Sequence, residues 1–292
     1  MDGWRKSTLK SLLEGCSWQY ALEQVYELPT HGSPHTALGT GFHSAVEHWE
    51  NNGRAPGMAE LQDVAAESAF EQAKQLPMDL WFEHGLDPQW VVDGAREAVR
   101  LWIEQPYVKG GVTLQKITEG RECLGTEVFL KANHPDSERG LQGTVDALYM
   151  DDYGLTIVDY KTASSFRKWT YNQPPTIEAS AYMWMAAQNY DACQYTFEWH
   201  IVSPKEGKTR LLSAGNMSPE QLEKLSTSLR DAETLVKYNA FRPNPDWNLC
   251  QRKWCSFYEG CQVTGELSPT RLPISYVPVD ATAPVASDGV EG

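Results

Sequence analysis

The sequence lacks long hydrophobic runs, and none of its apolar stretches approaches the roughly 20 residues that a membrane-spanning helix needs. The N-terminal residues, Met1-Asp-Gly-Trp-Arg-Lys, lead into no apolar secretion segment. These two absences favour an intracellular protein, and we expect it in the cytoplasm. The motif Gly-x-x-x-x-Gly-Lys-Ser/Thr is also missing, so we expect no nucleotide-driven motor in this chain.

Positive charge is scarce. The chain has 25 Lys and Arg residues against 39 Asp and Glu residues, which gives a net charge of −14. That balance argues against broad binding of duplex nucleic acid, which depends on neutralising phosphates with Lys and Arg. It leaves room for a local basic groove beside an acidic site that binds cations. The 292 residues are enough for one large domain or two small ones.

Apolar periodicity predicts both helices and strands along the chain. The predicted helices cover about 4–26, 36–50, 58–76, 88–105, 175–187 and 218–238. Strand-like patterns begin at Thr113 and continue at 122–131, 141–161, 193–202 and 209–213. This mixture predicts an α/β fold.

The stretch at 141–161 contains the most informative pattern. Two apolar segments flank the turn Asp151-Asp-Tyr-Gly154, which predicts a β-hairpin. Asp146 lies in the first strand and Asp159 at the end of the second, so the two carboxylates can converge. Lys161 points to the same side of its strand as Asp159. Two oxygen ligands and an ammonium suit a Mg²⁺ or Mn²⁺ site acting on a phosphate.

The hairpin and its flanks resemble the PD-(D/E)XK nuclease superfamily, specifically its RecB-like branch. That branch has the pattern G-x-x-D, a hairpin and D-x-K-T, and this chain has Gly143-Thr-Val-Asp146 and Asp159-Tyr-Lys161-Thr162. The resemblance implies metal-dependent hydrolysis of DNA. In that reading Asp146 and Asp159 bind one or two metal ions, and Lys161 orients the attacking water or stabilises the transition state.

The resemblance covers most of the chain apart from about 52–117 and the C-terminal tail. It implies one RecB-like nuclease domain over residues 1–263, with a mixed β-sheet core flanked by helices and a helical insertion at about 52–110. Residues 264–292 are rich in Pro, Ser, Thr, Val and Ala, which predicts an extended or disordered tail.

Two further candidates for the metal site follow from the resemblance. Gly39-Thr-Gly-Phe-His43 matches a Gly-Thr-x-x-His step whose histidine approaches the metal, so His43 is a candidate ligand. An imidazole ligand favours Mn²⁺ over Mg²⁺. The family also has a glutamate in the strand before G-x-x-D. Glu127 is our candidate for it, with Glu119 and Glu122 as competitors.

Residues after the hairpin supply the remaining site candidates. Glu178 and Tyr182 are four apart on one helix face and fall where the family has Gln-x-x-x-Tyr, so both join the catalytic candidates. Glutamate in place of glutamine leaves the role of Glu178 open. The loop at 162–175 combines cations with aromatic rings, as proteins that bind single-stranded nucleic acid do. Its candidate DNA-binding residues are Arg167, Lys168, Trp169 and Tyr171.

The six cysteines suggest metal binding or free thiols before disulfides, given the expected compartment. Cys250, Cys255 and Cys261 are spaced like metal ligands. A tetrahedral site needs a fourth ligand from elsewhere in the chain, and Cys16 is the natural donor. Cys123 and Cys193 have no cysteine neighbours, so we predict that they are buried thiols.

One early cysteine and a C-terminal trio resemble the iron–sulfur members of the RecB-like branch, which include the AddB nuclease domain and the CRISPR adaptation nucleases. Two departures are Ser17 in place of a proline, and four residues, in place of the usual two, between Cys250 and Cys255. The resemblance implies a [4Fe–4S] cluster that joins the N- and C-terminal segments. Structural Zn²⁺ is the alternative.

Taken together, these patterns predict an exonuclease that acts on single-stranded or frayed DNA ends with Mg²⁺ or Mn²⁺. Two alternatives stay open. One is a DNA-binding module with a decayed active site, and the other is an iron–sulfur redox or sensor protein on a nuclease scaffold.

Overall fold

The computed structural model describes residues 3–107, 111–169, 177–269 and 271–272. Within this part of the chain, five strands form one sheet in the order β1-β2-β3-β4-β5. The strands are β1 (Glu122–His134), β2 (Ser137–Asp151), β3 (Gly154–Thr162), β4 (Tyr195–Ser203) and β5 (Lys208–Ala214). Among the described strands, only β3 and β4 pair in parallel, so the sheet is mixed, as the family resemblance implied.

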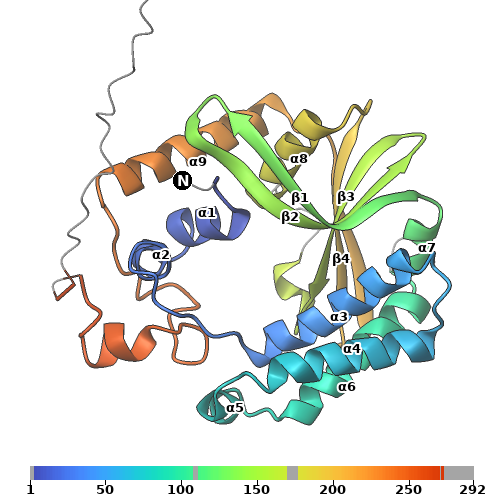
Figure 1. The fold of residues 1–292 in the computed structure, drawn as a ribbon, viewed down its shortest axis with the longest axis horizontal. Coiled ribbons are helices and arrows are strands. Elements are labelled where there is room, and N and C mark those ends of the chain that lie inside the picture. The colour runs from blue at the N-terminus through green and yellow to red at the C-terminus, as the bar shows by residue number, and fades with distance from the viewer. Residues whose placement is uncertain (1–2, 108–110, 170–176, 270, 273–292) are drawn as a thin grey trace, which may run out of the picture.

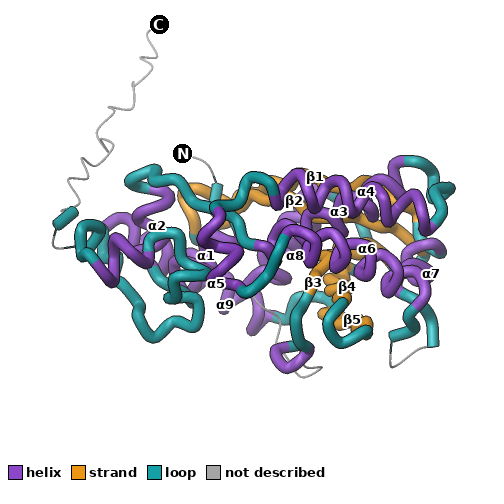
Figure 2. The backbone as a smooth tube through the Cα atoms, turned by 90° about the horizontal axis from the view of Figure 1, so that it is seen from below, coloured by secondary structure: helices purple, strands orange, loops and turns teal. Residues whose placement is uncertain are grey.

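Helices cover both faces of the sheet (Figure 1). Four of them pack on one face: α1 (Lys6–Leu13), α2 (Ser17–Gln24), α8 (Ile177–Asn189) and α9 (Pro219–Lys237). The other face carries α3 (Pro34–Asn51), α4 (Met58–Ala73), α5 (Met78–His84), α6 (Pro88–Glu104) and α7 (Leu114–Glu119). The N-terminal helices lie at one end of the elongated molecule and α7 at the other (Figure 2). None of the described helices combines the length and apolar character needed to cross a membrane.

The alternation of side chains along β2 and β3 builds two separate cores. Leu148 and Ile157 belong to the core beneath α1, α8 and α9. Their neighbours Tyr149 and Val158 belong to the core beneath α3 and α6. The sheet is therefore buried on both sides, and polar groups at its strand ends lie between two helical layers.

The predicted hairpin is present. β2 and β3 are antiparallel, Asp151 pairs with Gly154 across the turn, and Ala147 pairs with Val158 near the open end. This register sets Asp146 and Asp159 opposite each other at the end of the paired segment.

The prediction of a single helix at 4–26 is wrong, because the chain breaks between α1 and α2. The C-terminal segment occupies the break. A Cβ atom on Gly15 would lie 2.9 Å from the ring of Trp247, and the Asn244 side chain donates a hydrogen bond to the Gly15 carbonyl (2.9 Å). Cys16 is the N-cap residue of α2. These contacts join residues more than 200 positions apart, so helical periodicity could not reveal the break.

The prediction that strands begin at Thr113 is also wrong. Oγ1 of Thr113 accepts a hydrogen bond from the backbone N–H of Lys116 (3.3 Å) and caps the short helix α7. A threonine in the N-cap position stabilises a helix although threonine is also a common strand residue. The first strand begins at Glu122 instead.

The predicted helical insertion at about 52–110 contains α4, α5 and α6. The predicted tail at 264–292 is described only in its first part. There the Trp18 indole N–H donates to the carbonyl of Leu267 (2.7 Å), and the Tyr26 hydroxyl donates to the carbonyl of Leu272 (2.9 Å). Residues 270 and 273–292 lie outside the described residues, and the domain boundaries stay a prediction.

Candidate active site

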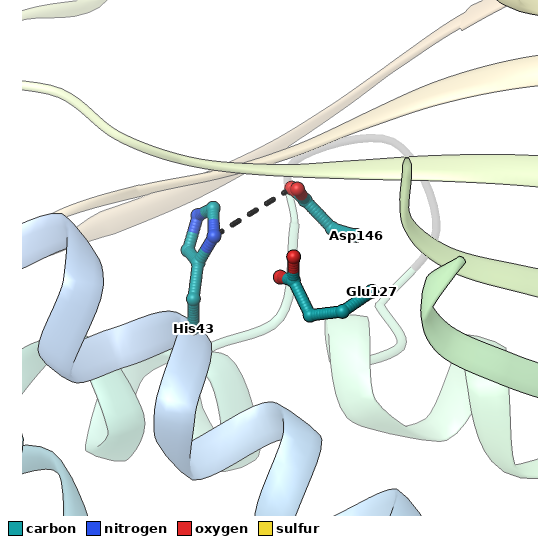
Figure 3. Close-up of side chains that lie close together, drawn as sticks. All are labelled: His43, Glu127 and Asp146. Atoms are coloured by element: carbon teal, nitrogen blue, oxygen red, sulfur yellow. Dashed lines mark ion pairs between the residues drawn. The ribbon is translucent and has the colours of Figure 1, made fainter. Parts of the chain in front are cut away.

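Three side chains from three different elements form a candidate metal site. His43 comes from α3, Glu127 from β1 and Asp146 from β2, and their polar atoms point toward one another (Figure 3). One nitrogen or oxygen atom of each lies within 4.8 Å of the others. The fold thus brings together residues that are far apart in the sequence, since His43 and Asp146 are separated by more than 100 positions.

The imidazole ring of His43 is oriented by the backbone of β3. Its Nε2 lies 2.7 Å from the carbonyl oxygen of Tyr160, and its Nδ1 lies 3.8 Å from Oδ2 of Asp146. Because a carbonyl oxygen only accepts hydrogen bonds, Nε2 carries the proton and donates it. When the ring is neutral, the lone pair of Nδ1 points toward the carboxylate, and this is the form of histidine that binds a metal ion.

A glycine in the His43 motif has a packing explanation. A Cβ atom on Gly41 would lie 2.7 Å from the Cβ of Ala69, which is closer than side chains pack. Glycine therefore allows α3 and α4 to lie in close contact. Phe42, the next residue, is completely buried. The helix that carries His43 is held firmly against its neighbours.

Glu127 lies beside Asp146 in the sheet, because its neighbours Thr126 and Val128 pair with Ala147 and Val145. Its backbone φ is +48°, a conformation that residues other than glycine rarely adopt. Such strained positions concentrate at functional sites.

The two competitors of Glu127 lie elsewhere. Glu119 is the last residue of α7, and Glu122 pairs with Met150 at the far end of β1. Of the three glutamates considered from the sequence, only Glu127 reaches His43 and Asp146 in the described structure.

The carboxylates of the site resist ionisation. Burial raises the pKa of Asp146; His43 opposes this effect and the charge of Asp159 adds to it. Glu127 is exposed as a residue, yet partial burial of its carboxylate raises its pKa, and Asp146 adds to this effect. A cation placed among such groups relieves their repulsion, so the trio is suited to a divalent ion.

Asp159 and Lys161, the second half of the predicted motif, form a neighbouring group. Asp159 is only 3% exposed. Its Oδ1 lies 2.9 Å from Nζ of Lys6, and its Oδ2 is ion-paired with Lys161. Burial acts to raise the pKa of Asp159, but the two ammonium groups outweigh it and hold the pKa below its ordinary value. Asp159 therefore faces cationic side chains, while the grouped ligands are His43, Glu127 and Asp146.

Glu178 joins the same group from α8. Its Oε1 lies 2.5 Å from Nζ of Lys6 and 3.9 Å from Nζ of Lys161. The sequence placed Glu178 among the catalytic candidates, but it did not indicate Lys6. No local pattern marks Lys6, because its partners Asp159 and Glu178 are 153 and 172 residues away.

Tyr182 packs against the G-x-x-D segment. Its hydroxyl donates a hydrogen bond to the carbonyl of Thr144 (2.7 Å). A Cβ atom on Gly143 would lie 3.1 Å from the Tyr182 ring, so the glycine of the motif makes room for this tyrosine. Tyr182 thereby fixes α8, and with it Glu178, against β2.

The predicted DNA-binding loop is described in part. Arg167 lies in the short 3-10 helix Phe166–Lys168 and is exposed. Trp169 is half-buried against the core, and its carbonyl accepts a hydrogen bond from the Arg210 guanidinium. Tyr171 and the side chain of Lys168 lie outside what the structure describes.

The four predicted cysteine ligands gather at one place. Cys16, Cys250, Cys255 and Cys261 line a single pocket together with Trp18, Leu22 and Phe257. Burial raises the pKa of the Cys255 thiol to about 11, despite a hydrogen bond from the backbone of Phe257, and the neighbouring thiols add to the increase. Among the six free thiols, Cys193 is exposed and Cys123 is half-buried, so the prediction that both are buried is wrong. Cys193 lies just before β4 on the surface, where its thiol donates to the carbonyl of Tyr153 (3.3 Å).

Comparison with known proteins agrees with this geometry. The family model of the PD-(D/E)XK nuclease superfamily matches residues 7–262. No curated protein matches the chain. The crystal structure of SSO0001 is similar to 91% of this chain and 96% of that one, with 15% sequence identity and a TM-score of 0.35. The family match spans every candidate ligand described above, and its members are generally metal-dependent nucleases. The chain belongs to the PD-(D/E)XK nuclease superfamily.

Proposed function

We propose that this protein is a metal-dependent deoxyribonuclease of the RecB-like branch, acting in the cytoplasm as an exonuclease on single-stranded or frayed DNA ends. The observation that carries the proposal is the convergence of His43, Glu127 and Asp146 beside the buried Asp159, which is ion-paired with Lys161. Free cysteines agree with a reducing compartment.

The donor set fits Mn²⁺ or Mg²⁺. One imidazole nitrogen and two carboxylates are hard or borderline ligands of the kind that these ions accept. His43, Glu127 and Asp146 would hold the ion, with Asp159 on the adjacent strand as a further candidate ligand. When bound, a divalent cation acidifies a water molecule and neutralises charge on the phosphate.

Lys161 supports the reaction from the protein side. Its ammonium is held by Asp159 and lies at the edge of the group of carboxylates. From there it can donate a hydrogen bond to the attacking water or to a phosphate oxygen whose charge increases in the transition state.

The proposed substrate follows from charge and from the loop after β3. A net charge of −14 leaves few cations for contacts along a duplex. Arg167 is exposed in the loop that follows Lys161, and the loop also supplies Trp169 together with the predicted contacts Lys168 and Tyr171. A few cations with aromatic rings suit a short single-stranded segment better than a long duplex.

The four cysteines are proposed to bind a [4Fe–4S] cluster, with Zn²⁺ as the alternative. Four thiols that line one pocket among apolar side chains match the ligand sets of both. The bound group would connect α2 to the C-terminal segment and so stabilise the fold.

A pair of matched substrates tests the proposed activity. The protein is incubated with an end-labelled linear single strand and with a closed circle of the same sequence, with Mn²⁺, with Mg²⁺ and with EDTA. We expect the linear strand to be shortened only when a metal ion is present, and the circle to remain intact. Arg167→Ala should bind the linear strand with a salt slope smaller by about one, whereas Lys224→Ala, an exposed cation on α9, should not.

The other outcomes are equally informative. If the circle were opened as fast as the linear strand is cleaved, the exonuclease assignment would be wrong, but the assignment as a nuclease would stand. Metal-loaded protein that binds the strand without cutting it would instead favour the DNA-binding module with a decayed site.

A further inference from the structure

Lys6 is an unexpected member of the active site. It is the first residue of α1, and it reaches across to Asp159 on β3 and Glu178 on α8. Its ammonium also lies 5.0 Å from the ring centre of Tyr182, a favourable cation–π distance. Three side chains from two elements of the site, β3 and α8, therefore converge on one side chain from the N-terminal segment.

The backbone on both sides of Lys6 is anchored, so this contact is part of the fold. Trp4 is 2% exposed; its N–H donates to the carbonyl of Gly140 (3.0 Å), and its carbonyl accepts from the N–H of Gln142 (2.9 Å). On the other side, Leu9 is completely buried in the core. The first turn of α1 is thus fixed next to the start of β2, with Lys6 directed at the site.

The position of Lys6 has an electrostatic consequence for metal binding. Asp159 gives one carboxylate oxygen to each of two ammonium groups. It lies next to Asp146 in the hairpin, because Ala147 pairs with Val158 and the backbone N–H of Tyr160 donates to Oδ2 of Asp146 (2.7 Å). A divalent cation bound by Asp146 therefore lies near Lys6 and competes with it for Asp159. Like charges at such separations repel strongly where water is excluded.

We propose that Lys6 is a positioning residue that sets the affinity of the site for its divalent cation. It holds Asp159 and Glu178 in place and opposes the binding of a second positive charge beside them. The effect on turnover rests on the proposed nuclease function, whereas the effect on metal affinity does not.

Three variants test this role: Lys6→Met removes the charge, Lys6→Arg retains it, and Lys10→Met removes an exposed charge one turn along the same helix. Mn²⁺ affinity is measured by titration calorimetry, and kcat and KM with the end-labelled single strand at saturating Mn²⁺. We expect Lys6→Met to bind Mn²⁺ at least about tenfold more tightly than the wild type, a difference in binding free energy of about 1.4 kcal/mol. Its kcat should fall while Lys6→Arg recovers part of it, and Lys10→Met should match the wild type in both measurements.

A purely structural role for Lys6 predicts the opposite sign, because a distorted site binds metal more weakly. Mn²⁺ affinity that is unchanged or weaker in folded Lys6→Met overturns the proposal. Should Lys6→Met fail to fold, Lys6→Gln and Lys6→Arg are compared, and equal Mn²⁺ affinities in these two overturn it as well. Tighter Mn²⁺ binding in a protein that cuts no DNA would refute the nuclease and leave the role of Lys6 intact.

Discussion

Asp159→Asn and Lys161→Met should each lower the rate of metal-dependent DNA cleavage by about a hundredfold to a thousandfold, the loss seen when one group that stabilises developing charge is removed. Both lysines contact Asp159. Nζ of Lys6 lies 2.9 Å from Oδ1 of Asp159, and Nζ of Lys161 is ion-paired with its Oδ2. Asparagine retains the volume of this buried side chain but not its charge. Lys161→Met keeps the length of the side chain and removes only the ammonium.

Folding must be measured beside the rate. Asp159 is buried within β3, and breaking a buried ion pair can cost about 3–5 kcal/mol of stability. The matched control is Asp152→Asn, which changes an exposed aspartate in the turn of the same hairpin. Single-turnover cleavage by a folded Asp159→Asn protein at the wild-type rate would show that the active site is elsewhere.

Cys255→Ser should remove the metal bound by the four-cysteine pocket and strongly destabilise the protein. Cys16 and Cys250 are separated by most of the chain, yet they line the same pocket with Cys255 and Cys261. A metal group bound there couples its binding free energy to folding, because the unfolded chain has no such site. We expect anaerobically purified wild-type protein to be brown and Cys255→Ser to be colourless, with a lower melting temperature.

Cys193→Ser is the control, since this thiol is exposed and far from the pocket in sequence. It should change neither colour nor melting temperature. A colourless wild-type protein with stoichiometric zinc would show that the four-cysteine site is correct but binds Zn²⁺ in place of an iron–sulfur cluster. If Cys16→Ser and Cys255→Ser both had the metal content of the wild type, this pocket would bind neither an iron–sulfur cluster nor Zn²⁺.

The sequence was most informative where function depends on short spacing. The hairpin with Asp146, Asp159 and Lys161 could be predicted because strand alternation and one turn determine its geometry. His43 and Glu127 required the family pattern in addition, since only the fold brings α3 and β1 to Asp146.

The remaining features depend on contacts between distant segments. The break before Cys16 is supported by Trp247 and Asn244, and the ion pairs of Lys6 join the N-terminal helix to β3 and α8. No pattern of local periodicity contains this information. The capping contact of Thr113 is local, and its segment was mistaken for a strand because threonine is also a common strand residue.

The location of Mn²⁺ in crystals of the protein tests the central claim most directly. Crystals soaked in Mn²⁺ should give an anomalous difference peak within bonding distance of Nδ1 of His43 and of carboxylate oxygens of Glu127 and Asp146. The same crystals of Asp146→Asn should show a much weaker peak or none, because a charged ligand is lost. Mn²⁺-dependent cleavage by a protein whose crystals show no peak at these three residues would contradict the account.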